Sequence, residues 1–500
     1  MKKNSFSKER RAFLRASASA GTAALLVTPA TASSGNPTLV ALENARQGSY
    51  DWYLNRMARN SEILGYASAT SINRGESINI HVHCVEPNYS LEVYRLGWYN
   101  GVGARLMKSP VMVSGTRQPM PTPDPVTGMV ECNWTNPYNL TTGTSATDPT
   151  VWPSGYYLVK LTSQPSGYQA YVVFVLRDDA RTADLLFQQS ITTYAAYNMW
   201  GGKNLYGGAG GRAYKVSLNR PFDDAAGAGG TFTLEVQMIR FLEREGYDVK
   251  YCTNVDTHTT LAKDWRAKAF LSVGHDEYWS WEMRSNVEQA RDRGINLGFF
   301  SANTCFRQIR FEPSPVTRAA NCTIVCYKDN LLDPYFNDPK LRNLTTTYWR
   351  GAPVNRPEAA LIGIQYAENM FPASGDIVVA NKSHWAFSDA NLNASNTRFI
   401  GLLNGREVDS IQSGSPSNIE VLCASQVRIN GLPDDPNRIS QVTIYTWPGS
   451  GAQVFAAGTM TWTWALDSFG SSWRYNVPVN LEAQQLTRNI LKRFTSNQFG

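Results

Sequence analysis

Alternating apolar and polar positions dominate the chain from residue 33 to about residue 180. Strand-like runs occupy residues 77–83, 91–96 and 171–176, and clusters of Gly, Pro and Asn separate them. A period of two is typical of strands that bury one face. We therefore expect residues 33–180 to form a β-sandwich domain.

After residue 181 the pattern changes to short, fully apolar runs that alternate with helical periods. Strands are predicted at residues 185–187, 247–252, 269–273 and 295–300. A helix containing Leu234 and Met238 should end at Gly246, and a second helix over residues 279–293 should end at Gly294. Apolar strands joined by helices predict a parallel sheet covered on both faces, so residues 181–500 are expected to form an α/β domain.

The C-terminal third gives a weaker pattern. Residues 442–447 and 454–464 are predicted to be strands. A last helix should pack Leu486, Ile490 and Phe494 against the rest of the domain.

Most of the net charge of +6 lies in the first 32 residues of the chain. Six of the 47 Lys and Arg residues but only one of the 41 Asp and Glu residues precede Ser33, which leaves 41 basic and 40 acidic residues beyond it. A nearly neutral mature chain offers little attraction to phosphate backbones, so we expect no nucleic-acid partner.

The first 32 residues have the parts of an export signal. A basic start precedes an apolar stretch at residues 23–27 and small residues at 30–32. Residues 9–15, with Arg10 and Arg11 followed by Phe13 and Leu14, resemble the twin-arginine signal of bacterial export. The prediction is a periplasmic or secreted protein without an integral membrane segment. Because this pathway exports folded proteins, the resemblance also favours a bound cofactor.

Polar residues gather where the predicted parallel strands end, which is where such sheets bind ligands. Gly274, His275, Asp276, Glu277 and Tyr278 follow the third α/β strand. A histidine with two carboxylates is costly to bury for packing alone. The alternative is that Asp276 or Glu277 caps the following helix.

Two other strand ends contribute to the same edge. Asn303 and Cys305 follow the fourth strand, and Tyr197 follows the first. A buried, inert Cys305 is favoured over a nucleophile. The Gly-rich stretch at residues 201–211 lacks the phosphate-loop order, so a lid over the crevice is expected.

These strings together resemble the large (β) subunit of N,N-dimethylformamidase and its relatives. The resemblance rests on residues 94–99, 103–106, 152–157, 196–202, 273–279 and 301–303. It implies a β-sandwich followed by a class I glutamine-amidotransferase-like α/β domain. It also implies a mononuclear ferric iron held by Tyr157, Tyr197 and Glu277, which would place the metal between the two predicted domains.

Two phenolates and a carboxylate carry three negative charges, and all three are hard oxygen ligands suited to ferric iron. The leading interpretation is an exported, iron-dependent hydrolase of a small amide C–N bond. In it His275 assists proton transfer, Asn303 holds the substrate or the oxyanion, and Glu407 acts in acid–base chemistry. Self-association into a homo-oligomer stays open.

A second interpretation belongs to another functional class. The aromatic-rich β-domain, in a chain with 14 Trp and 24 Tyr, could bind a glycan or polymer without catalysis. Fold alone does not separate the two interpretations, because function depends on the site.

Overall fold

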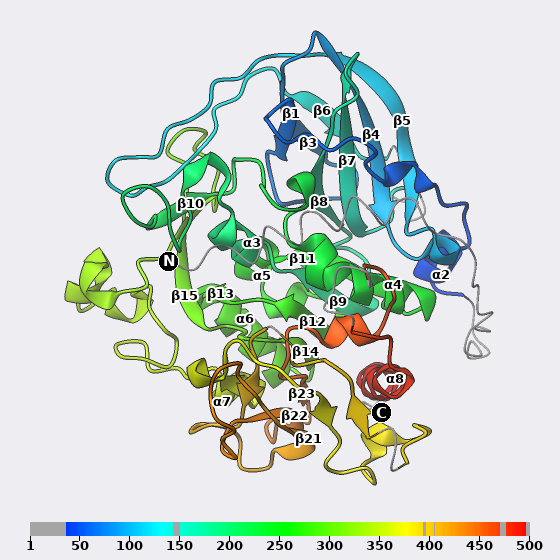
Figure 1. Ribbon diagram of the computed structural model, residues 1–500, viewed down its shortest axis with the longest axis vertical. Coiled ribbons are helices and arrows are strands. Elements are labelled where there is room, and N and C mark those ends of the chain that lie inside the picture. Colours follow the sequence, from blue (N-terminus) through cyan, green and yellow to red (C-terminus); the bar gives the residue numbers. More distant parts are fainter. Residues whose placement is uncertain (1–36, 144–150, 394–396, 405, 471–476, 497–500) are drawn as a thin grey trace.

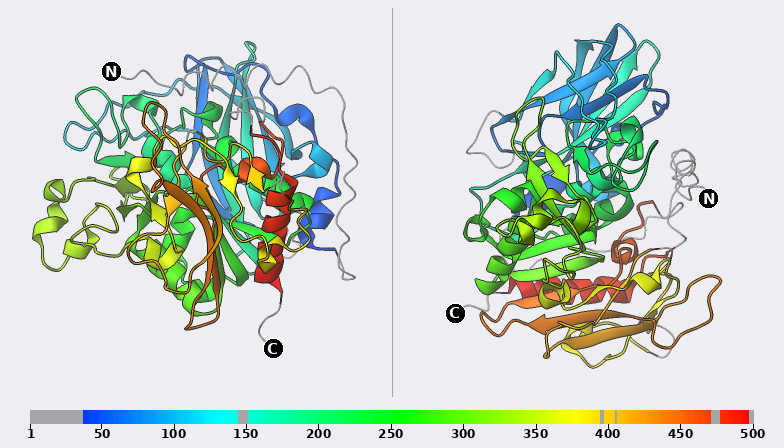
Figure 2. Two further views of the ribbon diagram at one scale, coloured as in Figure 1. Left: turned by 60° about the horizontal axis from the view of Figure 1, so that its bottom comes forward. Right: turned by 90° about the vertical axis from the view of Figure 1, so that its left-hand side faces the viewer.

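The computed structural model describes residues 37–143, 151–393, 397–404, 406–470 and 477–496. The predicted export signal at residues 1–32 lies outside these ranges. The fold is mixed α/β, with several sheets and few long helices. Figure 2 shows the N-terminal strands at one end of an elongated molecule and the C-terminal strands at the other.

The N-terminal region contains two sheets. A three-stranded sheet has the order β1-β3-β6, and a five-stranded sheet has the order β2-β8-β7-β4-β5. All pairings in them are antiparallel except that of β2 with β8. The bounds are β1 (Ile63–Ala67), β2 (Ser71–Asn73), β3 (Ser77–Cys84), β4 (Asn88–Leu96), β5 (Ala104–Ser114), β6 (Tyr138–Thr141), β7 (Gly155–Gln164) and β8 (Gln169–Arg177).

The predicted alternation is confirmed in this region. The three strand-like runs fall in β3, β4 and β8, and along β3 the inward positions Ile78, Ile80 and Val82 are buried. These side chains share one apolar cluster with Val93 of β4 and Val172 of β8. Burial of one face explains the period of two in β3 and the first half of β4, whereas β8 is buried on both faces.

A seven-stranded sheet forms the centre of the molecule, with the order β11-β9-β12-β14-β23-β22-β21. The first five strands are parallel, and β22 and β21 are added to them by antiparallel pairings. The bounds are β9 (Ala183–Gln189), β11 (Val249–Thr253), β12 (Ala267–His275), β14 (Asn296–Ala302), β21 (Glu420–Gln426), β22 (Ile439–Thr446) and β23 (Gln453–Ala456). All four predicted α/β strands are present and parallel.

Helices cover both faces of this sheet (Figure 1). Leu185 and Phe187 of β9 pack in the same cluster as helices α4 and α8, whereas Leu186 packs with α6 on the opposite face. The helix bounds are α2 (Leu39–Asn44), α3 (Ile191–Tyr197), α4 (Val236–Arg244), α5 (Asn254–Thr259), α6 (Trp281–Asp292), α7 (Ala359–Ile362) and α8 (Leu481–Thr495). No helix in these ranges is long and apolar enough to cross a membrane.

Smaller sheets complete the fold. A four-stranded sheet has the order β10-β16-β15-β13, and two further pairs are β17–β20 and β18–β19. Their bounds are β10 (Lys215–Ser217), β13 (Tyr278–Ser280), β15 (Arg307–Glu312), β16 (Thr323–Val325), β17 (Gln365–Tyr366), β18 (Ile377–Val378), β19 (Arg398–Phe399) and β20 (Asp409–Ser410).

Helix ends follow the sequence signals closely. Gly246 and Gly294, with φ of 77° and 91°, lie just after the C-caps of α4 and α6. Neither Asp276 nor Glu277 caps α6, because Ser280 does so, accepting a hydrogen bond from the Met283 amide at 3.1 Å. A π-helical turn, Thr231–Glu235, precedes α4.

The strand predicted for residues 454–464 is wrong beyond Ala456. Gly458 has a φ of 64°, and Trp462–Ala465 form a 3-10 helix. Aromatic residues have a high strand propensity, but here Trp462 and Trp464 are buried in the core beside α8. Tertiary packing therefore overrides the local preference.

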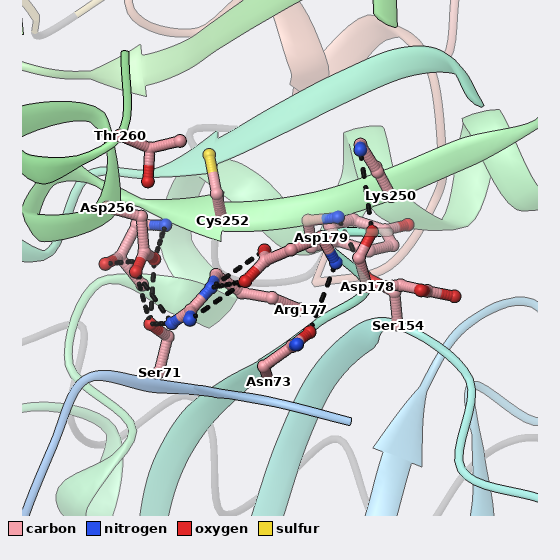
Figure 3. Close-up of polar contacts among 12 residues, drawn as sticks. Ser71, Asn73, Ser154, Arg177, Asp178, Asp179, Lys250, Cys252, Asp256 and Thr260 are labelled. Atoms are coloured by element: carbon pink, nitrogen blue, oxygen red, sulfur yellow. Dashed lines mark hydrogen bonds and ion pairs between the residues drawn. The ribbon is translucent and has the colours of Figure 1, made fainter. Parts of the chain in front are cut away.

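Ion pairs join the N-terminal sheets to helices that pack on the seven-stranded sheet. Arg177 of β8 contacts Asp256 of α5 at 2.8 Å, and Ser71 of β2 donates to the same carboxylate at 2.7 Å (Figure 3). Arg95 of β4 binds both oxygens of Glu243 of α4, at 2.9 and 2.8 Å. All seven cysteines are buried and unpaired.

Candidate active site

Two tyrosines and a glutamate bring their oxygens together at the carboxyl end of the parallel strands. Tyr197 is the last residue of α3, Glu277 follows β12, and Tyr206 lies in the loop after α3. The Tyr197 hydroxyl donates to Glu277 Oε2 at 2.7 Å. The Tyr206 hydroxyl lies 2.8 Å from the same oxygen and 2.7 Å from the Tyr197 hydroxyl. We call Tyr197, Tyr206 and Glu277 the tyrosine–glutamate cluster.

Glu277 is held by the turn that ends β12. Gly274 has a φ of 73°, and a Cβ there would lie 2.6 Å from Leu234 Cβ, so only glycine fits. The buried Asp276 carboxylate accepts hydrogen bonds from Gln188 of β9 at 2.7 Å and Asn254 of α5 at 2.9 Å. These contacts fix the backbone from which Glu277 projects.

The surroundings keep the two phenols in their neutral form. Although 36% of Tyr197 and 46% of Tyr206 is exposed, their hydroxyl ends are enclosed, and this enclosure, followed by the Glu277 carboxylate, raises the pKa of both phenols well above the ordinary value. The Tyr278 hydroxyl donates to the Tyr206 hydroxyl at 2.6 Å, and the Lys328 ammonium lies 3.1 Å from the centre of the Tyr206 ring. Ionisation of either phenol would need an added positive charge in direct contact with its oxygen.

A second group, His275, Glu407 and Asn303, lies beside the cluster. His275 Nε2 is 3.1 Å from Glu407 Oε2 and 3.5 Å from Glu277 Oε2. Burial alone would lower the pKa of His275, but the Glu407 carboxylate outweighs it and raises that pKa. Burial likewise opposes the ionised form of Glu407, whereas His275 and Asn303 more than compensate and lower its pKa.

Asn303 is placed by an unusual backbone conformation. Its φ is 53°, and its amide donates to Asp409 Oδ1 at 2.8 Å. Its side chain helps to lower the pKa of the Glu407 carboxylate, while its Oδ1 is buried without a hydrogen-bond partner. Such strain and an unsatisfied buried acceptor are typical of functional sites.

Tyr157 does not join the tyrosine–glutamate cluster. Its hydroxyl donates to the Pro153 carbonyl at 2.6 Å, and its ring is stacked between Trp152 and Phe174 in the core of the N-terminal sheets. The structure thus brings five of the six predicted site residues together and places the sixth elsewhere. All members of the cluster follow residue 180, so it does not bridge the two predicted domains.

Tyr206 was missed in the sequence. It lies in the Gly-rich stretch that was expected to act only as a lid, and no strand or helix period fixes its direction. The only sequence signal for Tyr206 is that it is a second tyrosine, nine residues after Tyr197. In the structure the two rings stack with their centroids 4.3 Å apart.

The composition of the cluster differs from the usual metal sites. Within the described ranges, no three His, Cys, Asp or Glu side chains come together in a way that could hold a metal ion. The tyrosine–glutamate cluster instead offers two phenol oxygens and a carboxylate. Hard oxygen donors of this kind suit a small, highly charged cation.

The fold and this cluster define a mixed α/β protein with a polar site at the ends of its parallel strands. The chain belongs to the N,N-dimethylformamidase beta subunit-like, C-terminal family, which matches residues 90–476. No curated protein matches the chain.

Proposed function

We propose that the protein is an exported, metal-dependent hydrolase that cleaves a small amide C–N bond and uses ferric iron. The observation that carries this proposal is the convergence of three acidic oxygens from Tyr197, Tyr206 and Glu277 within 2.7–2.8 Å of one another. Family membership supports the amide substrate.

The residues of the cluster fit such an ion. Without a cation the two phenols beside the Glu277 carboxylate stay protonated, because their surroundings raise the pKa of both. Once deprotonated, two phenolates and one carboxylate would balance the charge of Fe³⁺. Tyr206 takes the place that the family resemblance gave to Tyr157.

A ferric ion held there would supply Lewis acidity toward a substrate carbonyl. His275, paired with Glu407, is positioned to accept a proton from an attacking water and to return it to the leaving amine. The free Oδ1 of Asn303 can accept a hydrogen bond from a substrate or from water, and the Asn303 side chain helps to lower the pKa of Glu407.

The finer description of the fold belongs to the same proposal. We interpret the two N-terminal sheets as a β-sandwich domain ending near residue 180, and the seven-stranded sheet as a class I glutamine-amidotransferase-like domain. The shared apolar cluster of the two N-terminal sheets supports the first assignment, and the helix-covered parallel sheet supports the second.

Metal analysis of protein purified from its native cell tests the proposal. We expect about one iron per chain in the wild type and loss of that iron in Glu277→Ala. Glu282→Ala, which removes a half-exposed carboxylate of α6, is the matched control and should keep the iron. Stoichiometric zinc, or iron that survives Glu277→Ala, would contradict the ligand assignment.

The non-catalytic alternative predicts a different result. A binding protein would be colourless and metal-free, and it would retain glycan after Glu277→Ala. Visible absorption and a glycan-binding assay on the same preparation therefore separate the two functions.

A further inference from the structure

The loop between Tyr197 and Tyr206 must fold back sharply for the two hydroxyls to meet. Helix α3 ends at Tyr197, and the next residues form a 3-10 turn, Trp200–Gly202. The Leu205 amide then donates to the Ala196 carbonyl at 3.1 Å, which returns the chain to the end of α3. The last carbonyls of a helix have no partner within the helix, so this end needs donors from elsewhere.

Arg220 supplies those donors. Its Nη1 donates to the carbonyls of Trp200 at 2.9 Å and Lys203 at 3.0 Å. Its Nη2 donates to the carbonyls of Asn198 at 3.0 Å and Ala195 at 3.4 Å. One guanidinium thus binds the end of α3 and both sides of the turn that follows.

The side chain of Arg220 is almost fully buried, with 1% of its surface exposed. Burial lowers the pKa of Arg220 to about 10, with the Asp223 carboxylate acting in the opposite direction. Burying a cation costs free energy unless its donors are hydrogen-bonded. The buried guanidinium of Arg220 therefore indicates a role beyond packing. The flat fork of arginine, unlike an ammonium, can reach four acceptors at once.

Asn204 completes the loop from inside. Its Nδ2 donates to the Tyr197 carbonyl at 2.8 Å, and its Oδ1 accepts from the amides of Tyr206 at 2.8 Å and Gly207 at 2.9 Å. The amide group of one side chain therefore joins the backbones of the two tyrosines directly. The Ala213 amide closes the loop on the Asn204 carbonyl at 2.8 Å.

We propose that Arg220 is the positioning residue of the tyrosine–glutamate cluster: through four backbone carbonyls it holds the loop in which Asn204 sets Tyr197 and Tyr206 side by side. Neither Arg220 nor Asn204 touches the clustered oxygens, and both act through the backbone. The inference rests on the proposed function for the meaning of the cluster. The loop geometry itself does not depend on it.

The test compares Arg220→Met with Arg284→Met in the full-length protein. Arg284 is a matched control, because it is equally buried and also donates to backbone carbonyls, those of Arg356 and Pro357, away from the loop. Hydrogen–deuterium exchange is measured over residues 203–213, and melting temperature, iron content and the phenolate-to-iron absorption band are measured on the same samples.

We expect both variants to lose thermal stability, but only Arg220→Met to exchange its loop amides roughly tenfold faster, because only that loop loses its anchor. Only Arg220→Met should lose iron and shift or weaken the absorption band. Arg220→Lys keeps the charge with a single nitrogen and should give an intermediate result. If Arg220→Met does not fold, Arg220→Lys and Asn204→Asp are compared with Arg284→Lys in the same way.

Unchanged loop exchange together with an unchanged absorption band in the Arg220 variants would overturn the inference. A wild type with neither iron nor an absorption band would overturn the proposed function instead. In that case the exchange rates of the loop still decide whether Arg220 positions it.

Discussion

Tyr157 and Tyr206 show how differently two tyrosine hydroxyls can be used in one chain. The Tyr157 hydroxyl satisfies a backbone carbonyl in an apolar core, whereas the Tyr206 hydroxyl meets a carboxylate and two other phenols. The first arrangement needs no further partner. The second arrangement brings acidic groups together, and these repel one another once ionised. A bound cation would offset that repulsion.

Tyr157→Phe is expected to act on stability alone. The substitution leaves the buried Pro153 carbonyl without its donor, so the free energy of unfolding should fall by about 1–3 kcal/mol. Chemical denaturation measures this, and metal analysis should find the iron content unchanged. Loss of iron in Tyr157→Phe would return Tyr157 to the set of ligands.

Most of the site could be predicted from the sequence, and the physical reason is the sheet. His275 ends β12, and Glu277 and Asn303 follow β12 and β14; because the carboxyl ends of these parallel strands meet at one edge, the three residues lie close together. Tyr206 could not be predicted, because a loop has no period. Tyr157 and Tyr156 are both fully buried in β7, in clusters on opposite faces, and a fully buried strand gives no alternation to orient them.

At the scale of single elements, the N-cap of helix α6 is a residue that the sequence analysis did not single out. Ser280, not an acidic residue, accepts the Met283 amide, and its hydroxyl also contacts His258 Nδ1 at 2.8 Å. The carboxylates before it are engaged elsewhere: Asp276 joins three elements, and Glu277 faces the tyrosines.

Ser280→Ala should lower the free energy of unfolding by about 1 kcal/mol, the usual cost of losing an N-cap. Iron content should not change, because α6 contributes no residue to the cluster. Thermal denaturation with metal analysis checks both statements. Ser285→Ala, in the body of the same helix, serves as the comparison and should cost less.

At the scale of the whole molecule, the junction between the N-terminal sheets and the seven-stranded sheet depends on buried charges. Arg95 and Glu243 have fully buried side chains, and Glu243 also accepts from Asn44 and Tyr251. Tyr157, which lies in the N-terminal sheets, is not part of the tyrosine–glutamate cluster, so a metal in that cluster would not link the two regions. We therefore expect removal of metal to leave the resistance of this junction to proteolysis unchanged.

Arg95→Met should cost about 3–5 kcal/mol of unfolding free energy, because it leaves the Glu243 carboxylate buried without its cation. The double variant Arg95→Met with Glu243→Met should be more stable than Arg95→Met alone. Denaturation of the three proteins measures this, and a double variant no better than the single one would show that the pair is not the cause.

Lys250 makes the same junction sensitive to pH. Its ammonium donates to the Arg181 carbonyl at 2.7 Å, and burial, followed by the charge of Arg181, lowers its pKa from 10.5 to about 8. The folded state therefore binds this proton more weakly than the unfolded state. The contribution of Lys250 to stability should rise as pH rises from about 8 to 10.5 and fall in the opposite direction.

Relative to Lys250→Met, the wild type should gain up to roughly 3 kcal/mol of unfolding free energy across that interval. Denaturant titrations of both proteins at several pH values measure the difference. Parallel stability curves for the two proteins would mean that Lys250 keeps its ordinary pKa in the folded state.

We propose that Tyr197 and Tyr206 together with Glu277 hold ferric iron. This proposal is tested most directly by the visible absorption spectrum of protein purified from its native cell, compared with Tyr197→Phe, Tyr206→Phe and Tyr157→Phe. We expect a phenolate-to-iron band in the wild type and in Tyr157→Phe, and its weakening or loss in each of the other two variants. A colourless wild type, or a band that survives Tyr206→Phe and disappears in Tyr157→Phe, would contradict the account.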